Sequence, residues 1–233
     1  MFAYIPARSG SKRLPNKNIY PLNGIPLIQK VIYELKKLSF ISNIYVSTDS
    51  NKIKKISEET GAICLDLRKK SLANDKAGFP DLIKHDLPRF IEHSNGDSKV
   101  LFTLATAALV TSSIYKKAHK KFSKFKPEIL MSCEPYHSPI WWALKKEKNG
   151  FLSPIFKKKI KINSQFLKDT YTDSGLFYFF DQKILKKYSS HKDVKKLLSF
   201  EVPFEHRCDL NNKEDLERLK WKYSRLKKKK LIK

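Results

Sequence analysis

The residues best suited to chemistry gather near the start of the chain, in the stretch 8–17. It reads RSGSKRLPNK and holds four cations, two serine hydroxyls, one glycine and no acidic residue. Backbone N–H groups at a turn, hydroxyls and cationic side chains are the groups that bind phosphate oxygens. The stretch matches neither the G-x-G-x-x-G nor the G-x-x-x-x-G-K-[ST] pattern. We therefore predict a phosphate-binding loop of another type; the alternative is an exposed turn in a chain rich in cations.

The segments that must position this loop read as alternating strands and helices. Apolar runs predict strands at FAYI, NIYVST, AICLDL, KVLFTLAT and EILMSCE. Between them, PLIQKVIYELKKL, NKIKKISEETG and TSSIYKKAHKKF have helical periodicity. A further helical stretch, 79–93, contains Pro88, which should kink or break it. This alternation favours a Rossmann-like, doubly wound α/β fold with a mostly parallel sheet, in which ligands bind beyond the carboxyl ends of the strands.

The alternation lapses between 135 and 168. The adjacent Trp141 and Trp142, followed by the turn-forming Asn149-Gly150, predict a β-hairpin that leaves the main sheet. A strand at SGLFYFF, a short strand and a final amphipathic helix then resume the pattern, with Asn211 or Asn212 as the cap of that helix. We expect an α/β domain of 1–134 and 169–233, with 135–168 as an inserted extension.

Composition and charge narrow the functional classes. The 233 residues are 41% hydrophobic, enough for a sizeable core. No apolar run approaches the roughly 18 residues that span a bilayer, and the first residues do not read as a signal peptide. Three cysteines without metal-type spacing suggest free thiols and hence the cytoplasm. The net charge of +25 raises the question of nucleic acid, but no nucleic-acid motif is present and the lysines are spread along the chain. We expect neither a nucleic-acid nor a membrane partner, with a basic nucleic-acid-binding protein as an alternative.

One family resembles this chain over nearly its whole length. The stretch IPARSGSKRLPNKNI is similar to the N-terminal signature of the acylneuraminate cytidylyltransferases, the CMP-nonulosonic acid synthetases. Further similar stretches follow in order: VSTDS, SLANDKA, LATAAL, SPIWWALKKEKNG, NSQFLKDTYTDSGLFYF and CDLNNKEDLE. Several of these look most like the pseudaminic acid branch. The resemblance implies transfer of CMP from CTP to the anomeric hydroxyl of a nonulosonic acid, with release of pyrophosphate. It also implies a homodimer that pairs through the extension. The two tryptophans would then lie at the subunit interface, unless they pack on their own sheet.

The resemblance also implies roles for individual residues. Arg8, Lys17 and Asp209 would be catalytic, the two cations by offsetting charge at the α-phosphate. Asp209 and Asn211 would hold Mg²⁺. The residues that would bind CTP are Arg8, Ser11, Lys17, Asn18, Arg68, Ala73 and Asp75. The sugar acid would meet Gln165, Tyr171 and Asp173. Alternatives are helix-capping roles for Asp75 and Asn211, and a plain core or edge role for Tyr171.

Three positions depart from the family pattern. Leu104 and Ala108 replace polar and proline residues that many sialate enzymes carry, and Asn211 replaces the second aspartate of the metal pair. An Asn ligand brings no charge, so the affinity for Mg²⁺ should fall. Two alternatives therefore stay open beside the pseudaminate enzyme. One is a cytidylyltransferase for another 2-keto-3-deoxy sugar acid, such as a Kdo derivative. The other is a degenerate homologue that binds nucleotide without catalysis.

Overall fold

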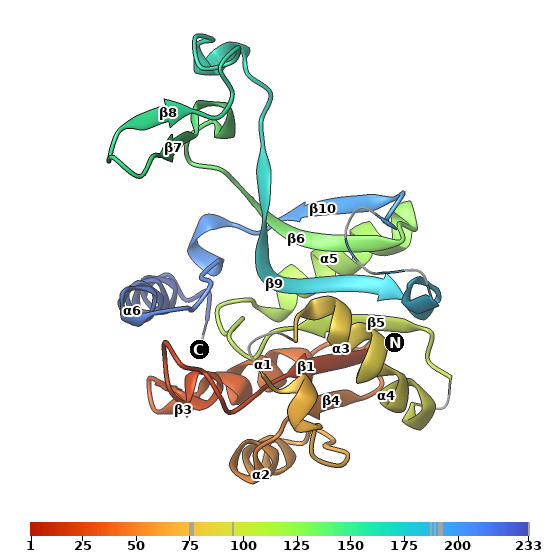
Figure 1. Cartoon of the computed structure of the whole chain (residues 1–233). Helices are drawn as coiled ribbons and strands as arrows, with labels where there is room; N and C mark the ends of the chain where they lie inside the picture. Colours follow the sequence, from red (N-terminus) through yellow and green to blue (C-terminus); the bar gives the residue numbers. More distant parts are fainter. Residues whose placement is uncertain (75–76, 95, 187, 189, 191–192, 233) are drawn as a thin grey trace.

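A mixed six-stranded sheet forms the centre of the molecule, in the order β10-β6-β9-β5-β1-β4 (Figure 1). The computed structural model describes residues 1–74, 77–94, 96–186, 188, 190 and 193–232. β9 runs antiparallel to both of its neighbours, whereas the other strand pairs are parallel. The predicted α/β fold with a mostly parallel sheet is therefore confirmed. The strands of this sheet are β1 (Phe2–Pro6), β4 (Ile44–Ser47), β5 (Lys99–Thr103), β6 (Ile129–Pro135), β9 (Tyr171–Asp181) and β10 (Leu197–Glu201).

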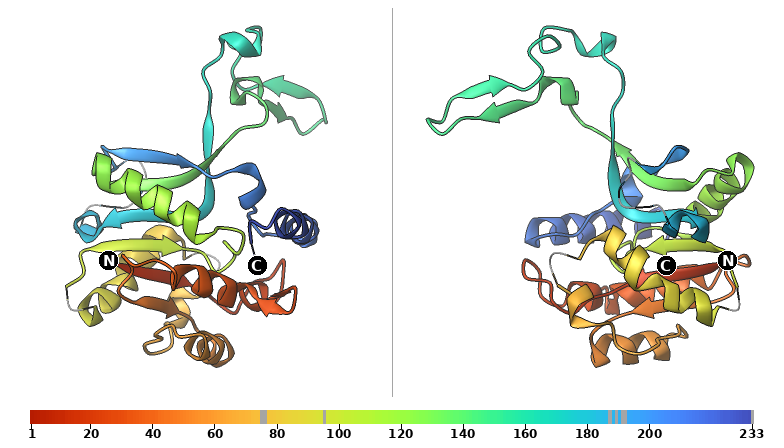
Figure 2. Two further views of the ribbon diagram at one scale, coloured as in Figure 1. Left: turned by 180° about the vertical axis from the view of Figure 1, so that it is seen from behind. Right: turned by 45° about the vertical axis from the view of Figure 1, so that its right-hand side comes forward.

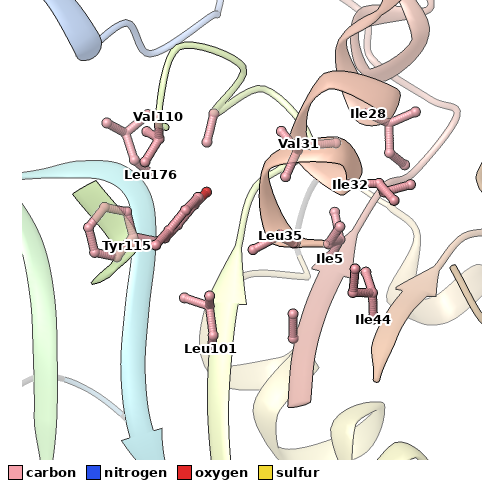
Figure 3. Packing of buried hydrophobic residues seen from close by; sticks show 14 of the residues in the cluster. Ile5, Ile28, Val31, Ile32, Leu35, Ile44, Leu101, Val110, Tyr115 and Leu176 are labelled. Atoms are coloured by element: carbon pink, nitrogen blue, oxygen red, sulfur yellow. The ribbon is translucent and has the colours of Figure 1, made fainter. Parts of the chain in front are cut away.

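Helices cover both faces of the sheet, because successive side chains of a strand point to opposite sides. On β1, Ala3 and Ile5 join a buried cluster with α1 and α5, which Figure 3 shows from close by. Phe2 and Tyr4 face the other side and pack with α3 and α4. The sheet is therefore wound on both faces. The helices are α1 (Leu27–Leu35), α2 (Asn51–Glu59), α3 (Phe79–His85), α4 (Leu87–His93), α5 (Ser112–Phe125) and α6 (Lys213–Lys228).

Two local expectations have opposite outcomes. The helical stretch 79–93 breaks at Asp86, between α3 and α4, as the nearby Pro88 predicted. The strand expected at AICLDL was wrong. Only one isolated bridge forms there, between Tyr45 and Ile63. The segment lies beside β4, the last strand of the sheet, and pairs too briefly to extend it.

Shorter elements complete the described chain. A small hairpin pairs β2 (Pro21–Leu22) with β3 (Ile25–Pro26). The 3₁₀ segments are η1 (Lys17–Ile19), η2 (Lys70–Leu72), η3 (Ile140–Trp142), η4 (Ser164–Phe166), η5 (Gln182–Lys186) and η7 (Phe204–His206). Among the described residues, no helix has both the length and the apolar character needed to cross a membrane.

The chain between β6 and β9 projects away from the sheet (Figures 1 and 2). It contains the predicted hairpin, formed by β7 (Leu144–Lys146) and β8 (Leu152–Pro154), with Gly150 in the turn at a φ of 89°. Trp142 donates its indole N–H to the carbonyl of Ile162 at 3.0 Å, and Trp141 packs edge-on against Phe156. The tryptophans thus make contacts within the projection. Its status as a separate unit and its part in pairing subunits stay predictions.

Candidate active site

The loop that follows β1 is held in place by hydrogen bonds at both ends. The backbone N–H of Ala7 donates to the carbonyl of Ser47 at 2.8 Å. The N–H and hydroxyl of Ser9 both donate to the carboxylate of Asp49, at 2.8 and 2.7 Å. The buried amide of Asn18 donates to the carbonyl of Arg8 at 2.9 Å. The predicted phosphate-binding loop therefore has a fixed backbone at the carboxyl end of β1, beside that of β4.

Lys17 links this loop to the segment that precedes α6. Its ammonium donates to the carbonyl of Leu210 at 2.8 Å. Burial lowers the pKa of the Lys17 ammonium, the nearby Asp209 carboxylate opposes that shift, and the charges of Arg13 and Arg8 add to it. The repulsion from these two arginines shows that positive charge is concentrated here. A bound anion would relieve the repulsion and favour the charged form of Lys17.

Asp209 and Asn211 lie side by side in an irregular segment that precedes α6. The Asn211 amide donates to Asp209 Oδ2 at 2.5 Å, and Asn211 Oδ1 accepts from the guanidinium of Arg13 at 2.9 Å. Asn211 is not the helix cap. Asn212 caps α6, where its Oδ1 accepts the N–H of Asp215 at 2.8 Å. The side chain of Asn211 is therefore available to the site and sits between a cation and a carboxylate.

Two clefts meet at Arg8 and Lys17. One, of about 360 Å³, is polar. The other, of about 300 Å³, is at the lower end of the range for small-molecule sites. The polar cleft is lined by Arg8, Ser11, Lys12, Arg13, Lys17 and Asn211. The second cleft combines Arg8, Lys17, Asn18 and Arg68 with apolar walls that include Leu72, Phe79, Phe102 and Leu104. This arrangement suits a polyphosphate joined to a flat, largely apolar group.

Arg68 is the most deeply placed cation of the second cleft. Its side chain is only 4% exposed, and its backbone N–H donates to the carbonyl of Thr48 at 2.7 Å. Within the part of the chain that the structure describes, the buried Nε of Arg68 has no hydrogen-bond partner. A buried donor without a partner is uncommon and costs stability. Arg68 is thus placed to bind a ligand acceptor in the cleft.

Not all the predicted site residues come together. Ala73 follows η2, next to the cleft residue Leu72, but is not among the described residues that line either cleft. Asp75 lies outside the described residues. Gln165 is exposed in η4, and Tyr171 is 49% exposed at the start of β9; neither lines the clefts as described. A single chain therefore assembles most of the predicted nucleotide side but not the sugar-acid side.

Asp173 does not line either cleft as described, but it contacts a residue that does. It is on β9, where its carboxylate accepts the backbone N–H of Gly175 at 2.8 Å and the hydroxyl of Tyr178. Tyr178 in turn lines the second cleft. Burial, reinforced by the Asp173 charge, raises the pKa of the Tyr178 hydroxyl well above its usual range, so Tyr178 stays a neutral donor. Asp173 therefore reaches the cleft through Tyr178 rather than directly.

Several residues of the site were not singled out from the sequence. Arg13 was counted among the four loop cations but received no role, whereas it bonds Asn211. Asp49 anchors the loop and lies in VSTDS, a stretch quoted only for its resemblance. Thr106, beyond the end of β5, and Tyr178, within β9, also line the second cleft. Their position just beyond or within predicted strands was the one available signal.

The residues present could hold a metal ion only together with a bound substrate that supplies further ligand atoms. Among the described residues, no three His, Cys, Asp or Glu side chains gather as a metal site. Asp209 supplies one carboxylate, and the Asn211 oxygen is already bonded to Arg13. Mg²⁺ is commonly held by one or two carboxylates together with substrate phosphates and water. Asp209 beside the polar cleft is compatible with that arrangement and not with a metal centre built from protein alone.

The comparison with known proteins decides the family. A family model described as Cytidylyltransferase matches residues 2–227. The chain belongs to this family. This cytidylyltransferase is 30% identical over 217 residues to the pseudaminic acid cytidylyltransferase of Campylobacter jejuni strain 81-176, an alignment that covers 91% of each chain. Over 75 residues, or 32% of each chain, it is 45% identical to the CMP-N,N'-diacetyllegionaminic acid synthase of Legionella pneumophila.

Solved structures support the fold of this cytidylyltransferase. A CMP:2-keto-3-deoxy-manno-octonic acid synthetase complexed with CTP superposes with a TM-score of 0.68. The superposition covers 96% of this chain and 98% of that one, at 14% sequence identity. At so low an identity the likeness concerns the fold alone.

Proposed function

We propose that this cytidylyltransferase transfers CMP from CTP to the anomeric hydroxyl of a nonulosonic acid, with pseudaminic acid as the best candidate. The observation that carries the proposal is the meeting of two clefts at Arg8 and Lys17, one polar and one partly apolar. The similarity to pseudaminic acid cytidylyltransferases over 91% of the chain supports this choice of sugar acid.

Each cleft would bind a different part of CTP. In this proposal the triphosphate lies along Arg8, Ser11 and Lys17 in the polar cleft. The base and ribose enter the second cleft, where Asn18 and Arg68 offer donors against apolar walls. Asn18 also fixes the carbonyl of Arg8, so it positions the loop that meets the phosphates. Ala73 and Asp75 would complete the rim of the same pocket.

The chemistry asks for positioning and charge rather than for a covalent intermediate. The anomeric oxygen attacks the α-phosphorus in line, a new O–P bond forms, and the bond to the β-phosphate oxygen breaks to release pyrophosphate. The hydroxyl proton would pass to a carboxylate or to water as this attack proceeds. Arg8 and Lys17 lie where both clefts meet and would stabilise the charge that builds up as pyrophosphate departs. Because both substrates are anions, a cationic site also brings them together.

Magnesium fits this scheme as a shared ion. When bound, it would neutralise part of the negative charge of the phosphates. Asp209 is the residue that would hold it. Asn211 would add only a neutral carbonyl oxygen, which already accepts one hydrogen bond from Arg13. A weak requirement for Asn211 and a strict one for Asp209 follow from this geometry.

The sugar-acid side would be completed by pairing two copies. Gln165 and Tyr171 lie towards the projection and not in the clefts. The projection exposes large apolar side chains, with Phe151 and Phe166 each 74% exposed. We propose that 135–168 is a dimerisation extension, and that Gln165, Tyr171 and Asp173 serve the sugar acid in the homodimer. Free cysteines at all three cysteine positions fit a reducing compartment such as the cytoplasm.

Pyrophosphate release tests this function. Purified protein would be supplied with CTP, Mg²⁺ and, in turn, pseudaminic, legionaminic, N-acetylneuraminic and Kdo acids. We expect the highest kcat/KM with pseudaminic acid. A higher value with Kdo would instead favour the alternative sugar-acid enzyme. No release with any acid, despite CTP binding, would favour the non-catalytic homologue. A gel shift at physiological salt separates the nucleic-acid alternative, because binding by charge alone weakens steeply with salt.

A further inference from the structure

A cleft of about 650 Å³ opens at the opposite end of the sheet from the candidate active site. β5 connects the two regions. Lys99 at its start lines this cleft, whereas Leu104, just after its end, lines the partly apolar nucleotide cleft. Five residues of extended chain span about 17 Å. The cleft is therefore separate from the site proposed for CTP, and its volume falls within the usual range for small-molecule sites.

The rim of this cleft is strongly cationic. Its lining includes five lysines, Lys99, Lys126, Lys183, Lys195 and Lys196, against two carboxylates, Glu128 and Asp181. None of these five ammonium groups forms a hydrogen bond or an ion pair with another described residue. Like charges held together without counter-charges repel one another. An anion in the cleft would remove that repulsion.

The two carboxylates offset only part of the positive charge of the rim, because five lysines face them. Glu128 accepts the N–H groups of Lys195 and Lys196 at 2.7 and 3.2 Å. Asp181 accepts the N–H of Lys183 at 2.9 Å. The carboxyl end of α5 also lies here and adds a partial negative charge of about half a unit. Five lysines exceed these charges, so the cleft remains positive.

The floor of the cleft is apolar and fixed. Phe122, Pro127 and Ile184 are buried residues of the lining. α5 ends directly above this floor, where Lys126 adopts a left-handed conformation and donates its N–H to the carbonyl of Phe122 at 2.9 Å. An apolar floor under a cationic rim suits a molecule that has one flat apolar face and several negative charges. A ring system would pack on the floor while the charged end reaches the lysines.

We propose that this cleft is a second ligand site that takes a nucleoside polyphosphate. The base would lie over the apolar floor, and the phosphates would bind the lysines, which act as mobile point charges for phosphate. The site needs no change in the assignment of Arg8, Lys17 and Arg68 to CTP. The proposal of a second site therefore does not depend on the proposed reaction.

Binding of a fluorescent ATP analogue, mant-ATP, tests the proposal in the full chain. The active site would first be saturated with CTP in the absence of sugar acid. The variant Lys126→Glu with Lys196→Glu reverses two rim charges. The control Lys117→Glu with Lys120→Glu makes the same charge change on exposed residues of α5 outside the cleft lining. We expect the affinity to fall at least about tenfold in the rim variant and less than about twofold in the control. Equal losses in both variants, or no binding to the wild type, would overturn the site.

A second pair of variants tests the floor without changing charge. Ser123 lines the cleft and is exposed, so Ser123→Trp should fill part of the space above the floor. Ser113→Trp, on an exposed position near the start of α5, is its control. Only the first should weaken mant-ATP binding, again about tenfold. Inorganic tripolyphosphate should bind more weakly than mant-ATP. If it binds as tightly, or if Ser123→Trp has no effect, the ring is not bound as proposed.

Discussion

The loop after β1 and the projection between β6 and β9 expose opposite kinds of side chain and are held in opposite ways. The loop is polar and charged, yet its hydrogen bonds reach Ser47, Asp49, Leu210 and Asn211, far away in sequence. The projection is rich in exposed apolar residues, and its two tryptophans bond within the projection itself. The described chain thus anchors the charged region by contacts distant in sequence and leaves apolar side chains of the projection exposed.

This difference suggests a different kind of binding partner for each region: a ligand for the loop and a protein for the projection. Exposed cations are readily solvated, so holding several of them in fixed places serves a ligand rather than the fold. Exposed aromatic residues such as Phe151 and Phe166 are unfavourable in water, and under the proposed pairing they would be covered by the second copy. We therefore expect changes in the loop to affect turnover and changes in the projection to affect assembly.

The largest effect should come from Asp209, whose carboxylate accepts the side-chain amide of Asn211 beside the polar cleft. Asp209→Ala should abolish detectable pyrophosphate release while CTP still binds, because the loop cations remain. Glu214→Ala, an exposed acidic residue in the first turn of α6, is the control and should retain activity. An Asp209→Ala enzyme as active as the wild type would show that the metal assignment is wrong.

Asn211→Asp sharpens the same question. It would place a second carboxylate beside Asp209 and Arg13. Arg13 alone cannot neutralise both carboxylates, so Mg²⁺ should bind more tightly and activity should saturate at a lower Mg²⁺ concentration. Titration of activity with Mg²⁺ measures this. An unchanged or weaker Mg²⁺ dependence would speak against a metal shared by these residues.

Lys17→Ala should have the next largest effect. It removes one of the two cations that line both clefts, the one whose ammonium donates to the carbonyl of Leu210. CTP affinity and turnover should fall together, by roughly 10- to 1,000-fold, on the scale of a lost charge-stabilising group. Lys213→Ala, an exposed lysine at the start of α6, is the matched control. Unaltered pyrophosphate release in a folded Lys17→Ala protein would rule out this role.

Assembly should respond to the projection instead. We expect the wild type to be a dimer by light scattering at micromolar concentration, and Phe151→Ser with Phe166→Ser to be a monomer. These two residues are cleaner targets than the tryptophans, because both are 74% exposed. Polar replacements of Trp141 and Trp142 should also yield monomers or aggregates, but they break contacts inside the projection as well. A monomeric wild type would contradict the pairing proposal.

Asp49→Ala should have a smaller effect on catalysis. It removes both hydrogen bonds that anchor Ser9, so the loop must be ordered when CTP binds. Each such bond contributes about 1 kcal/mol, which predicts a rise of roughly 5- to 30-fold in the KM for CTP. Turnover at saturating CTP should change little. A fall in kcat with an unchanged KM would show that Asp49 does more than anchor the loop.

The smallest effect concerns pH and stability. Burial lowers the pKa of Lys17 below its ordinary value of 10.5, so the unfolded chain binds more protons than the folded one between those two values. Stability must then rise with pH in that window. Relative to Lys17→Met, which cannot titrate, the wild type should become more stable as pH approaches 10.5. Urea unfolding at several pH values measures the difference in the free energy of unfolding between the two proteins. A difference that falls as pH rises would contradict the lowered pKa of Lys17.

Local signals in the sequence predicted well where chain neighbours decide the structure. Pro88 predicted a broken helix, and Asn149-Gly150 predicted the hairpin turn. The cation-rich stretch predicted a loop at the carboxyl end of β1. Each of these depends on the backbone preferences or charges of a few adjacent residues, which tertiary packing here did not override.

Features that depend on distant partners could not be predicted in the same way. Arg13 and Asn211 bond across 198 positions, and no local pattern marks that contact. Either Asn211 or Asn212 suited the helix cap, and only the hydrogen bond from Asp215 identifies Asn212. AICLDL has the composition of a strand, but at the edge of the sheet it forms a single bridge. Gln165 and Tyr171 line neither cleft of the described chain, and nothing in their local sequence indicated that distance from the nucleotide side.

A crystal structure of the protein with CTP tests the central claim most directly. The account predicts the triphosphate against Arg8, Ser11 and Lys17, with the base in the partly apolar cleft near Arg68. A triphosphate bound elsewhere, with Arg8 and Lys17 making no contact to it, would contradict the account.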